Sequence, residues 1–248
     1  MSARKQILQA VNRLIAPTGA QLYRAGIDME YALGWLARRN RRHCDDGIAG
    51  ILDLGAAQGN WSRMALDLFP EARVIGVDPL EERRPFLDRL RAENPRFDYV
   101  LAVAGEDDGG TASLSVTDDL DGSSVDGAEG AMRSVPVRSV DSIVAEKGIP
   151  GPYFLKFDTH GFEAPILRSA ERTLADTRFV VMEAYNFRHT PETLLFHEMV
   201  GFMETRGFRV THLVDVLNRP ADGVLWQVDL MFARDDDPVF ASNGFRGG

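Results

Sequence analysis

A short apolar run followed by two spaced glycines constrains the fold of this chain more than any other segment. The run Ile51–Leu54 contains Asp53, and Gly55 and Gly59 follow in the spacing G-x-x-x-G before an amphipathic stretch. This order predicts a strand, a tight turn and a helix, because glycine lets the backbone approach a ligand where a Cβ would intervene. The first N–H groups of a helix favour a carboxylate or a phosphate. We therefore expect a ligand site here, formed by Asp53, Gly55, Ala56, Ala57, Gln58 and Gly59.

A second acid follows the next predicted strand. The strand Arg73–Val77 is followed by Asp78. Its distance of about twenty residues from the first turn is typical of βαβ units in which the acid accepts a ribose hydroxyl. The third predicted strand ends where the adenine of such a ligand is expected. We therefore predict a nucleoside cofactor, with a helix cap and plain turns as the alternative roles of these residues. The expected contacts are Asp78, Pro79, Ala104 and Gly105.

The spacing of the first turn distinguishes between nucleoside cofactors. A dinucleotide turn needs G-x-G-x-x-G, and Ala57 stands where its middle glycine would be. The turn also has no P-loop lysine, which makes phosphoryl transfer unexpected. The pattern Asp-x-Gly-x-x-x-Gly, which begins at Asp53, is typical of methyltransferases in which the acid faces the ammonium of S-adenosylmethionine. We therefore expect S-adenosylmethionine as the cofactor, with a nicotinamide dehydrogenase as a less favoured reading.

Strand-like and helix-like segments alternate along most of the chain. The strands are short and apolar throughout, as buried parallel strands are, so the pattern predicts an α/β fold with a doubly wound, mostly parallel sheet. Expected strands cover 51–54, 74–77, 99–104, 153–157 and 179–182, and expected helices cover 61–68, 81–93, 140–146, 164–174 and 192–205. An extra hairpin is expected from 111–116 and 134–137, and a closing hairpin with an antiparallel last strand from 208–213 and 226–232.

Three regions are expected along the chain. Residues 1–46 are expected to form an N-terminal extension of two helices with a break at Pro17. This extension is expected either to cover the substrate or to form an oligomer contact. Residues 47–235 form the cofactor-binding domain, and residues 236–248 form a tail. The acidic, glycine-rich segment 117–132 is interpreted as a mobile loop, either a substrate lid or a disordered segment.

Composition excludes some partners. The net charge of −9 suits a phosphate backbone poorly, so a nucleic-acid acceptor is not expected. No apolar run reaches the roughly 18 residues that span a bilayer, so no membrane contact is expected. Cys44 is the one cysteine, which excludes an internal disulfide. Together with the lack of an apolar signal segment after Met1, this predicts a cytoplasmic protein. A homodimer stays open.

A longer stretch resembles a known family. Residues Phe154–Glu163 read Phe-Leu-Lys-Phe-Asp-Thr-His-Gly-Phe-Glu, and the apolar run Ile166–Ala170 follows. This is similar to the signature of FkbM-type methyltransferases: Leu-Lys-Ile-Asp, two variable residues, Gly, one residue, Glu and an apolar helix. The resemblance covers roughly residues 48–233, most of the chain. Further matching segments are Asp53–Gly59, Val103–Gly105, Ser139–Ile143, Val181–Glu183 and Trp226–Leu230.

The resemblance implies a fold and an activity. The fold is a Rossmann-like methyltransferase fold with a mostly parallel seven-stranded sheet, an antiparallel last strand, an extra hairpin after the third strand and, in this chain, added N-terminal helices. The activity is S-adenosylmethionine-dependent methylation of a hydroxyl on a sugar, a glycan, a polyketide or another natural product. His160 departs from the pattern, because the family often carries Glu or Gln there. Whether this position is catalytic throughout the family is left open.

Three residues at the ends of predicted strands are candidates for the chemistry. A hydroxyl acceptor must lose its proton, and a histidine has a suitable pKa. His160 follows the fourth strand and is the first candidate for this base, with a capping or packing role as the alternative. Asp158 ends the same strand and is expected to hold the methionine ammonium, orient His160 or bind a metal. Glu183 ends the fifth strand, and Lys156 is expected to pair with a buried carboxylate.

A metal site is the less favoured reading of the same acids. Asp158, Glu183 and Asn186 resemble the oxygen ligands with which some O-methyltransferases hold magnesium, a set that suits a hard cation. Because carboxylates at strand ends are common without a metal, we expect a metal-free methyltransferase with a small-molecule or glycan acceptor. N-methylation, peptide methylation and S-adenosylmethionine binding without catalysis are the alternatives.

Overall fold

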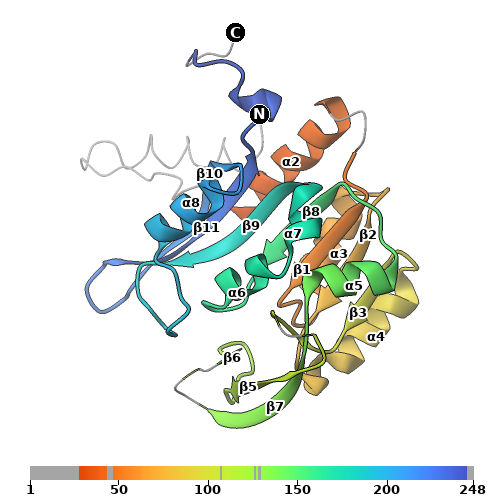
Figure 1. The fold of residues 1–248 in the computed structure, drawn as a ribbon, viewed down its shortest axis with the longest axis vertical. Helices are drawn as coiled ribbons and strands as arrows, with labels where there is room; N and C mark the ends of the chain where they lie inside the picture. The colour runs from red at the N-terminus through yellow and green to blue at the C-terminus, as the bar shows by residue number, and fades with distance from the viewer. Residues whose placement is uncertain (1–27, 44–46, 107, 126, 128–129, 245–248) are drawn as a thin grey trace, which may run out of the picture.

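A seven-stranded, mostly parallel sheet forms the centre of the molecule (Figure 1). The structure is a computed structural model that describes residues 28–43, 47–106, 108–125, 127 and 130–244. The strand order is β10-β11-β9-β8-β1-β2-β3, in which β11 runs antiparallel to both of its neighbours. This confirms the predicted fold class. The strands are β1 Gly50–Leu54, β2 Arg73–Val77, β3 Phe97–Val100, β8 Tyr153–Phe157, β9 Thr177–Tyr185, β10 Phe208–Asn218 and β11 Leu225–Arg234.

Helices cover both faces of this sheet. On one face Leu33, Leu66 and Leu87, from α2, α3 and α4, are buried in one apolar cluster. On the other face the helices α5 to α8 bury residues such as Ile143 and Met199 in a second cluster. Every residue of β1 and β8 is buried, which explains why their sequences show no polar alternation. The helices are α2 Met29–His43, α3 Asn60–Leu68, α4 Arg84–Glu93 after the 3₁₀ turn η2 Glu81–Arg83, α5 Val140–Lys147, α6 Glu163–Arg168, α7 Glu171–Ala175 and α8 Phe196–Glu204.

A second, four-stranded sheet lies beyond the carboxyl ends of the central strands, at the bottom of Figure 1. Its order is β4-β7-β5-β6, and β5 and β7 form the antiparallel hairpin expected after the third strand. The sheet has its own apolar cluster, which includes Leu114, Val125 and Val137. The strands are β4 Val103–Ala104, β5 Thr111–Val116, β6 Ser124–Val125 and β7 Ala131–Arg138.

Several predicted elements differ in extent from the structure. Strand β9 extends to Tyr185, so Glu183 lies inside this strand and does not end it, and α8 begins at Phe196 and not at residue 192. The strand predicted over 99–104 is divided, because β3 ends at Val100 and β4 pairs with β7 in the second sheet. The helix predicted over 164–174 is the two helices α6 and α7. Asp141, on α5, accepts the backbone N–H groups of Arg172 at 3.0 Å and Thr173 at 2.8 Å and so starts α7 from a distant part of the chain. The local sequence carries no sign of this contact.

The ends of the chain join the same core where they are described. Helix α2, in the expected N-terminal extension, packs its Leu33 and Leu36 against the central sheet. In the tail, Asp237 pairs with Arg39 of α2, and the 3₁₀ turn η3 Pro238–Phe240 follows. The first expected N-terminal helix, Cys44 and parts of the acidic loop lie outside the described residues. Within the described ranges, no helix combines the length and apolar character that crossing a membrane requires.

The cap that Asp141 provides for α7 gives a test of this packing. Asp141→Ala should lower the free energy of unfolding by about 2 kcal/mol, because a lost N-terminal cap leaves helix N–H groups without an acceptor. Chemical denaturation followed by far-UV circular dichroism measures the change. Asp67→Ala, at an exposed position of α3, is the control and should change the stability much less. Equal effects of the two substitutions would contradict the capping role.

Candidate active site

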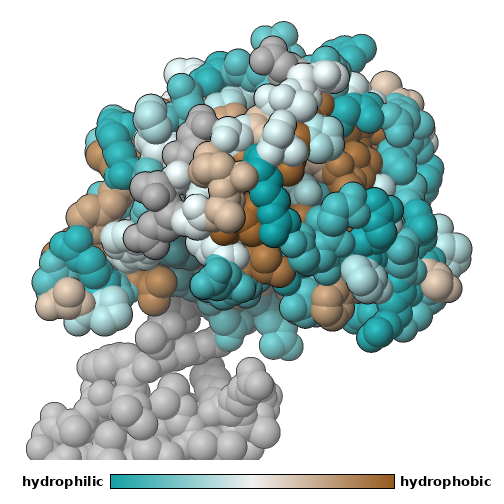
Figure 2. Space-filling model, turned by 90° about the horizontal axis from the view of Figure 1, so that it is seen from below, coloured by the Kyte–Doolittle hydropathy of each residue, from teal (hydrophilic) through white to brown (hydrophobic). Residues whose placement is uncertain are grey.

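A cavity of about 510 Å³ opens where β1, β2 and β8 end and the second sheet begins. Its walls include the turn after β1, the acid after β2 and the residues that follow β8. Figure 2 looks onto this end of the molecule and shows apolar side chains surrounded by a mostly hydrophilic surface. Ten of the sequence-predicted residues line the cavity: Gly55, Ala56, Ala57, Gln58, Asp78, Pro79, Ala104, Asp158, His160 and Glu183.

The turn after β1 brings the backbone close to β8. Gly55 has a φ of 82°, and a Cβ there would lie 1.9 Å from the carbonyl oxygen of Asp158. Ala57 also has a positive φ, 46°, and donates its N–H to Asp78 Oδ2 at 2.9 Å. Gly59 does not line the cavity, and a Cβ there would lie 2.9 Å from Leu90 of α4. The first glycine is therefore needed for the cavity wall and the second for helix packing.

Asp78 lies at the floor of the cavity and holds the turn in place. It is 6% exposed and accepts N–H groups from Ala57 and Leu80, each at 2.9 Å. Burial raises the pKa of this carboxyl, although the two N–H groups and the charge of Arg83 oppose the shift. Each oxygen keeps a further lone pair for a ligand hydroxyl. Asp78, the residue predicted to hold the ribose, therefore has lone pairs that can accept hydrogen bonds from hydroxyl groups of a ligand.

Asp53 does not line the cavity, although the sequence places it in the ligand motif. Its carboxylate is fully buried, accepts a hydrogen bond from Ser62 Oγ at 2.6 Å and lies 3.0 Å from Lys156 Nζ. Lys156 lines the cavity instead and also contacts Asp158 at 3.1 Å and the Gly55 carbonyl at 3.0 Å. Burial opposes the charge of Lys156, but the two carboxylates outweigh it and raise its pKa. The pairing predicted for Lys156 is confirmed.

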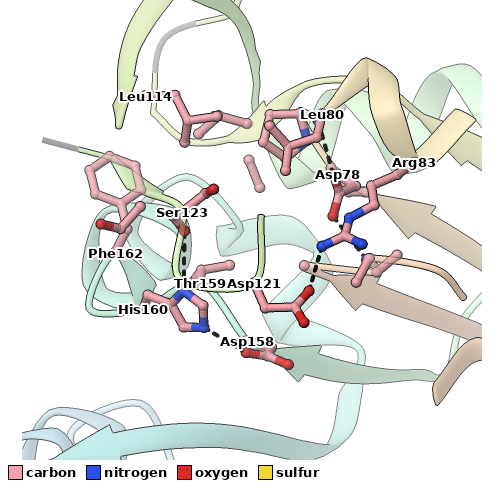
Figure 3. A pocket seen from close by; sticks show the side chains of 18 of the residues that line it. Asp78, Leu80, Arg83, Leu114, Asp121, Ser123, Asp158, Thr159, His160 and Phe162 are labelled. Atoms are coloured by element: carbon pink, nitrogen blue, oxygen red, sulfur yellow. Dashed lines mark hydrogen bonds and ion pairs between the residues drawn. The ribbon is translucent and has the colours of Figure 1, made fainter. Parts of the chain in front are cut away.

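Asp158 and His160 lie next to each other in the cavity wall (Figure 3), and Glu183, which also lines the cavity, lies close to His160. The Nε2 atom of His160 lies 3.3 Å from Asp158 Oδ1 and 3.8 Å from Glu183 Oε2. Its Nδ1 donates to the carbonyl of Ser123 at 3.1 Å. Burial alone would lower the pKa of His160, but the two carboxylates raise it to about 9. The imidazole is therefore mostly protonated at neutral pH.

The two acids of this cluster have opposite pKa shifts. Burial would raise the pKa of Asp158, but the charges of Lys156 and His160 lower it well below its usual range. Burial and the neighbouring Asp158 raise the pKa of Glu183. Glu183 accepts hydrogen bonds from Tyr185 Oη and from Gln227 Nε2, the latter at 2.8 Å. Both donors hold this carboxylate in position.

A buried glutamate supports the turn that carries His160. Glu163 is 2% exposed and accepts hydrogen bonds from Thr159 Oγ1 and the Gly161 N–H, each at 3.0 Å. His160 itself has a φ of 53°, a left-handed conformation that the surrounding contacts must hold. Burial raises the pKa of Glu163 to about 7. Glu163, which matches the last residue of the family signature, thus maintains the local conformation of the site.

The remaining predicted residues lie outside the cavity. Gly105 donates its N–H to the Arg138 carbonyl and so belongs to the second sheet. Asn186 of the predicted metal set does not line the cavity. Within the described part of the chain, the group of His, Cys, Asp and Glu side chains able to share a metal is Asp158, His160 and Glu183, whose ligand atoms lie within 4.8 Å of one another. The structure therefore pairs the two acids with His160.

Several cavity residues were not predicted from the sequence. Trp61 lines the cavity from the start of α3. Arg83 lines it as a buried cation, and the second sheet adds Asp121 and Ser123. The hairpin after the third strand was a visible signal that this segment lies near the site. The side chains that reach the cavity depend on a fold of the hairpin that its sequence does not specify.

A nucleoside-sized cavity at the carboxyl edge of this sheet, beside a glycine turn and an acid after β2, defines the class of Rossmann-like methyltransferases. The model of the methyltransferase FkbM domain matches residues 53–210. The chain therefore belongs to the FkbM methyltransferase domain family. A comparison with curated proteins finds no match.

Several solved structures are similar in fold to this chain. Methyltransferase FkbM from Methylobacillus flagellatus has 18% identity and a TM-score of 0.49, with 75% of this chain and 43% of that chain covered. A putative RNA methyltransferase from Pyrococcus horikoshii has 18% identity and a TM-score of 0.45, with 83% and 82% covered. The fibrillarin pre-rRNA processing protein of Methanococcus jannaschii has 12% identity and a TM-score of 0.48, with 76% and 67% covered. This chain thus spans less than half of the Methylobacillus chain.

The buried Glu163 gives a pH-dependent test. Its pKa is about 7 in the folded protein and about 4.3 in an unfolded chain. The folded state therefore binds the proton more tightly, so stability is greatest below the unfolded pKa and falls as pH rises through the folded one. The loss should approach roughly 3 kcal/mol between about pH 4 and about pH 8. Denaturation of the wild type and of Glu163→Gln at a series of pH values measures it.

The Gln variant lacks the titrating group, so its stability relative to the wild type should increase with pH. Glu204→Gln, at an exposed position of α8, serves as the matched control and should run parallel to the wild type. Parallel pH curves for Glu163→Gln and the wild type would contradict the proton uptake assigned to this residue.

Proposed function

We propose that this protein transfers a methyl group from S-adenosylmethionine to a hydroxyl of a small molecule or a glycan. The observation that carries the proposal is the position of His160, Asp158 and Glu183 at the edge of a cavity that also contains the glycine turn and Asp78. The family membership supplies methyl transfer as the reaction class. The acceptor, the cofactor and the roles of the residues are the proposed parts.

The residues of the cavity fit the proposed cofactor. Its volume of about 510 Å³ lies in the range of roughly 300–1,000 Å³ that is usual for ligand sites. Gly55 lets the turn after β1 lie directly against the backbone of Asp158, where a Cβ would clash, and Asp78 keeps acceptor capacity for ribose hydroxyls. When bound, S-adenosylmethionine supplies a methyl group on a positively charged sulfur, so that positioning is the main task of the protein. Lys156 neutralises Asp53 and Asp158 beside this space.

His160 is the proposed base for the hydroxyl acceptor. Its Nδ1 hydrogen is committed to Ser123, so Nε2 is the atom that accepts the acceptor's proton. Asp158 and Glu183 both face Nε2 and stabilise the resulting imidazolium. The same carboxylates keep much of His160 protonated at neutral pH, so the active base form becomes more abundant as the pH rises.

The acidity of the site favours amine methylation as a second candidate. A smaller cavity of about 170 Å³ shares Trp61 and Lys156 with the first, and four acids are among its lining residues: Asp158, Glu183, Asp215 and Asp229. Burial and the neighbouring acids raise the pKa of one of them, Asp229, to about 8. Such a cavity would accommodate an ammonium group. Mass spectrometry with S-adenosylmethionine carrying a deuterated methyl group identifies whether oxygen or nitrogen of a candidate acceptor is modified.

Neither a nucleic acid, a membrane nor a resident metal is part of the proposal. The net charge of −9 gives no general attraction to phosphates. His160 and Lys156 already supply positive charge to Asp158 and Glu183, which favours a metal-free site. A cytoplasmic location and a homodimer remain expectations from the sequence, as do peptide methylation and binding without turnover as alternatives.

Cofactor binding has a direct test at Asp78. Calorimetry with S-adenosylhomocysteine should give a measurable dissociation constant for the wild type, and Asp78→Asn should weaken binding about tenfold or more because a charged hydrogen bond to the ribose is lost. Glu71→Gln, exposed just before β2, should leave binding unchanged. A wild-type protein that is folded and binds no adenosyl compound would overturn the proposed cofactor.

The base role of His160 predicts a pH profile. With an acceptor identified by the deuterated-methyl experiment, kcat/KM should rise about tenfold per pH unit and level off near the pKa of about 9 that His160 has in the free protein. His160→Ala should retain S-adenosylhomocysteine binding while turnover falls about 100-fold or more. An unchanged pH profile in His160→Gln would assign the proton transfer to another group.

A further inference from the structure

The segment 117–125 makes two contacts across the active-site cavity. It starts after β5 and includes β6 of the second sheet. The two residues that it contacts, Arg83 and His160, follow strands of the central sheet. Asp121 pairs with Arg83, and the carbonyl of Ser123 accepts the Nδ1 hydrogen of His160 (Figure 3). The segment thus reaches both the Asp78 end of the cavity and the His160 end.

Arg83 is the buried partner of this segment. Arg83 is 4% exposed and belongs to the turn η2. Its charge reaches the nearby Asp78, where it opposes the rise that burial causes in the pKa of that carboxyl. Its Nε is buried without a hydrogen-bond partner among the described residues. Its partner is exposed, since 75% of the side-chain surface of Asp121 is accessible to solvent. A buried guanidinium needs a counter-charge, and Asp121 supplies it only when the segment lies over the cavity.

The second contact determines the state of His160. With the Nδ1 hydrogen donated to Ser123, Nε2 is the nitrogen that faces Asp158 and Glu183. The acceptor is a backbone carbonyl, so it moves only with the segment. His160 also has a positive φ, which makes its position depend on the contacts around it.

The two contacts move together because the segment is short and internally bonded. Asp121 and Ser123 are two residues apart, a distance of at most about 7 Å along the chain. The carbonyl of Thr117 accepts a hydrogen bond from the Leu120 N–H at 3.0 Å, and Ser123 Oγ accepts one from the Thr117 N–H at 3.2 Å. A change at Asp121 is therefore transmitted to the carbonyl of Ser123.

We propose that segment 117–125 is a strap that positions His160, and that Asp121 acts through Arg83 as its positioning residue. The strap joins the cofactor end of the cavity to the base. The coupling between Arg83, Asp121 and His160 goes beyond the proposed methyl transfer, because it is a property of the ligand-free protein. In the transfer reaction its role is to hold Nε2 toward the acceptor before the acceptor arrives.

Asp121→Asn tests the strap without any acceptor. The imidazole titration of His160, assigned by comparison with His160→Gln, is followed by NMR in the ligand-free protein. Its midpoint should fall in Asp121→Asn, because the Ser123 carbonyl raises the pKa of His160 and is displaced when the strap loosens. The dissociation constant for S-adenosylhomocysteine, measured by calorimetry, should rise about fivefold or more, the usual size of such a coupling. Asp121→Glu should restore both values toward the wild type.

Asp118→Asn is the matched control, because Asp118 is an exposed acid of the same strap and no ion pair joins it to a described residue. It should leave the titration of His160 and the calorimetry unchanged. The proposal is overturned if Asp121→Asn leaves the His160 midpoint unchanged, or if Asp118→Asn moves it equally. A wild type that binds no S-adenosylhomocysteine overturns the proposed cofactor alone, because the ligand-free titration still decides the strap.

Discussion

The buried ion pair of Lys156 is the interaction on which the rest of the site depends. Lys156 and Asp53 are register partners on adjacent parallel strands, and Asp158 is the first residue after the strand that carries Lys156. One ammonium therefore serves two carboxylates and the carbonyl of Gly55. Without it, the fully buried Asp53 would have no neighbouring cation and would lie near the partly exposed Asp158, at an electrostatic cost. The ion pair also joins the turn after β1 to the end of β8, the two segments that form the wall of the cavity.

Oppositely charged side chains are paired in the cavity wall. Arg83 pairs with Asp121, Lys156 pairs with Asp158, and His160 lies beside Asp158 and Glu183. Each cation contacts at least one acid, so an overall acidic protein maintains positively charged side chains in the site. The raised pKa of His160 and the lowered pKa of Asp158 are consequences of this pairing. The second sheet completes the arrangement, because Asp121 and Ser123 come from it.

Much of the fold was predictable from local patterns. Buried strands such as β1 and β8 appear as apolar runs, and the glycine turn with Asp78 appears at a characteristic spacing. Elements whose limits depend on distant partners were not predictable: β4 leaves the central sheet to pair with β7, and α7 starts where Asp141 caps it. The same reason explains Asp53, whose carboxylate the motif assigns to a ligand but whose neighbours are Ser62 and Lys156.

By itself, the sequence determined the family, the mostly parallel sheet and the strand ends that Asp78, Asp158 and His160 follow, whereas Glu183 lies inside β9 and not at its end. The periodicity of apolar residues, the spacing of motif residues and the residue types of turns are local properties of a sequence. A parallel sheet then brings the carboxyl ends of its strands to one edge. Only the tertiary structure decided which charges meet. Arg83, Asp121 and Gln227 entered the site through strand register and the folding of the second sheet, because contacts between residues far apart in the chain follow from the packing of whole elements.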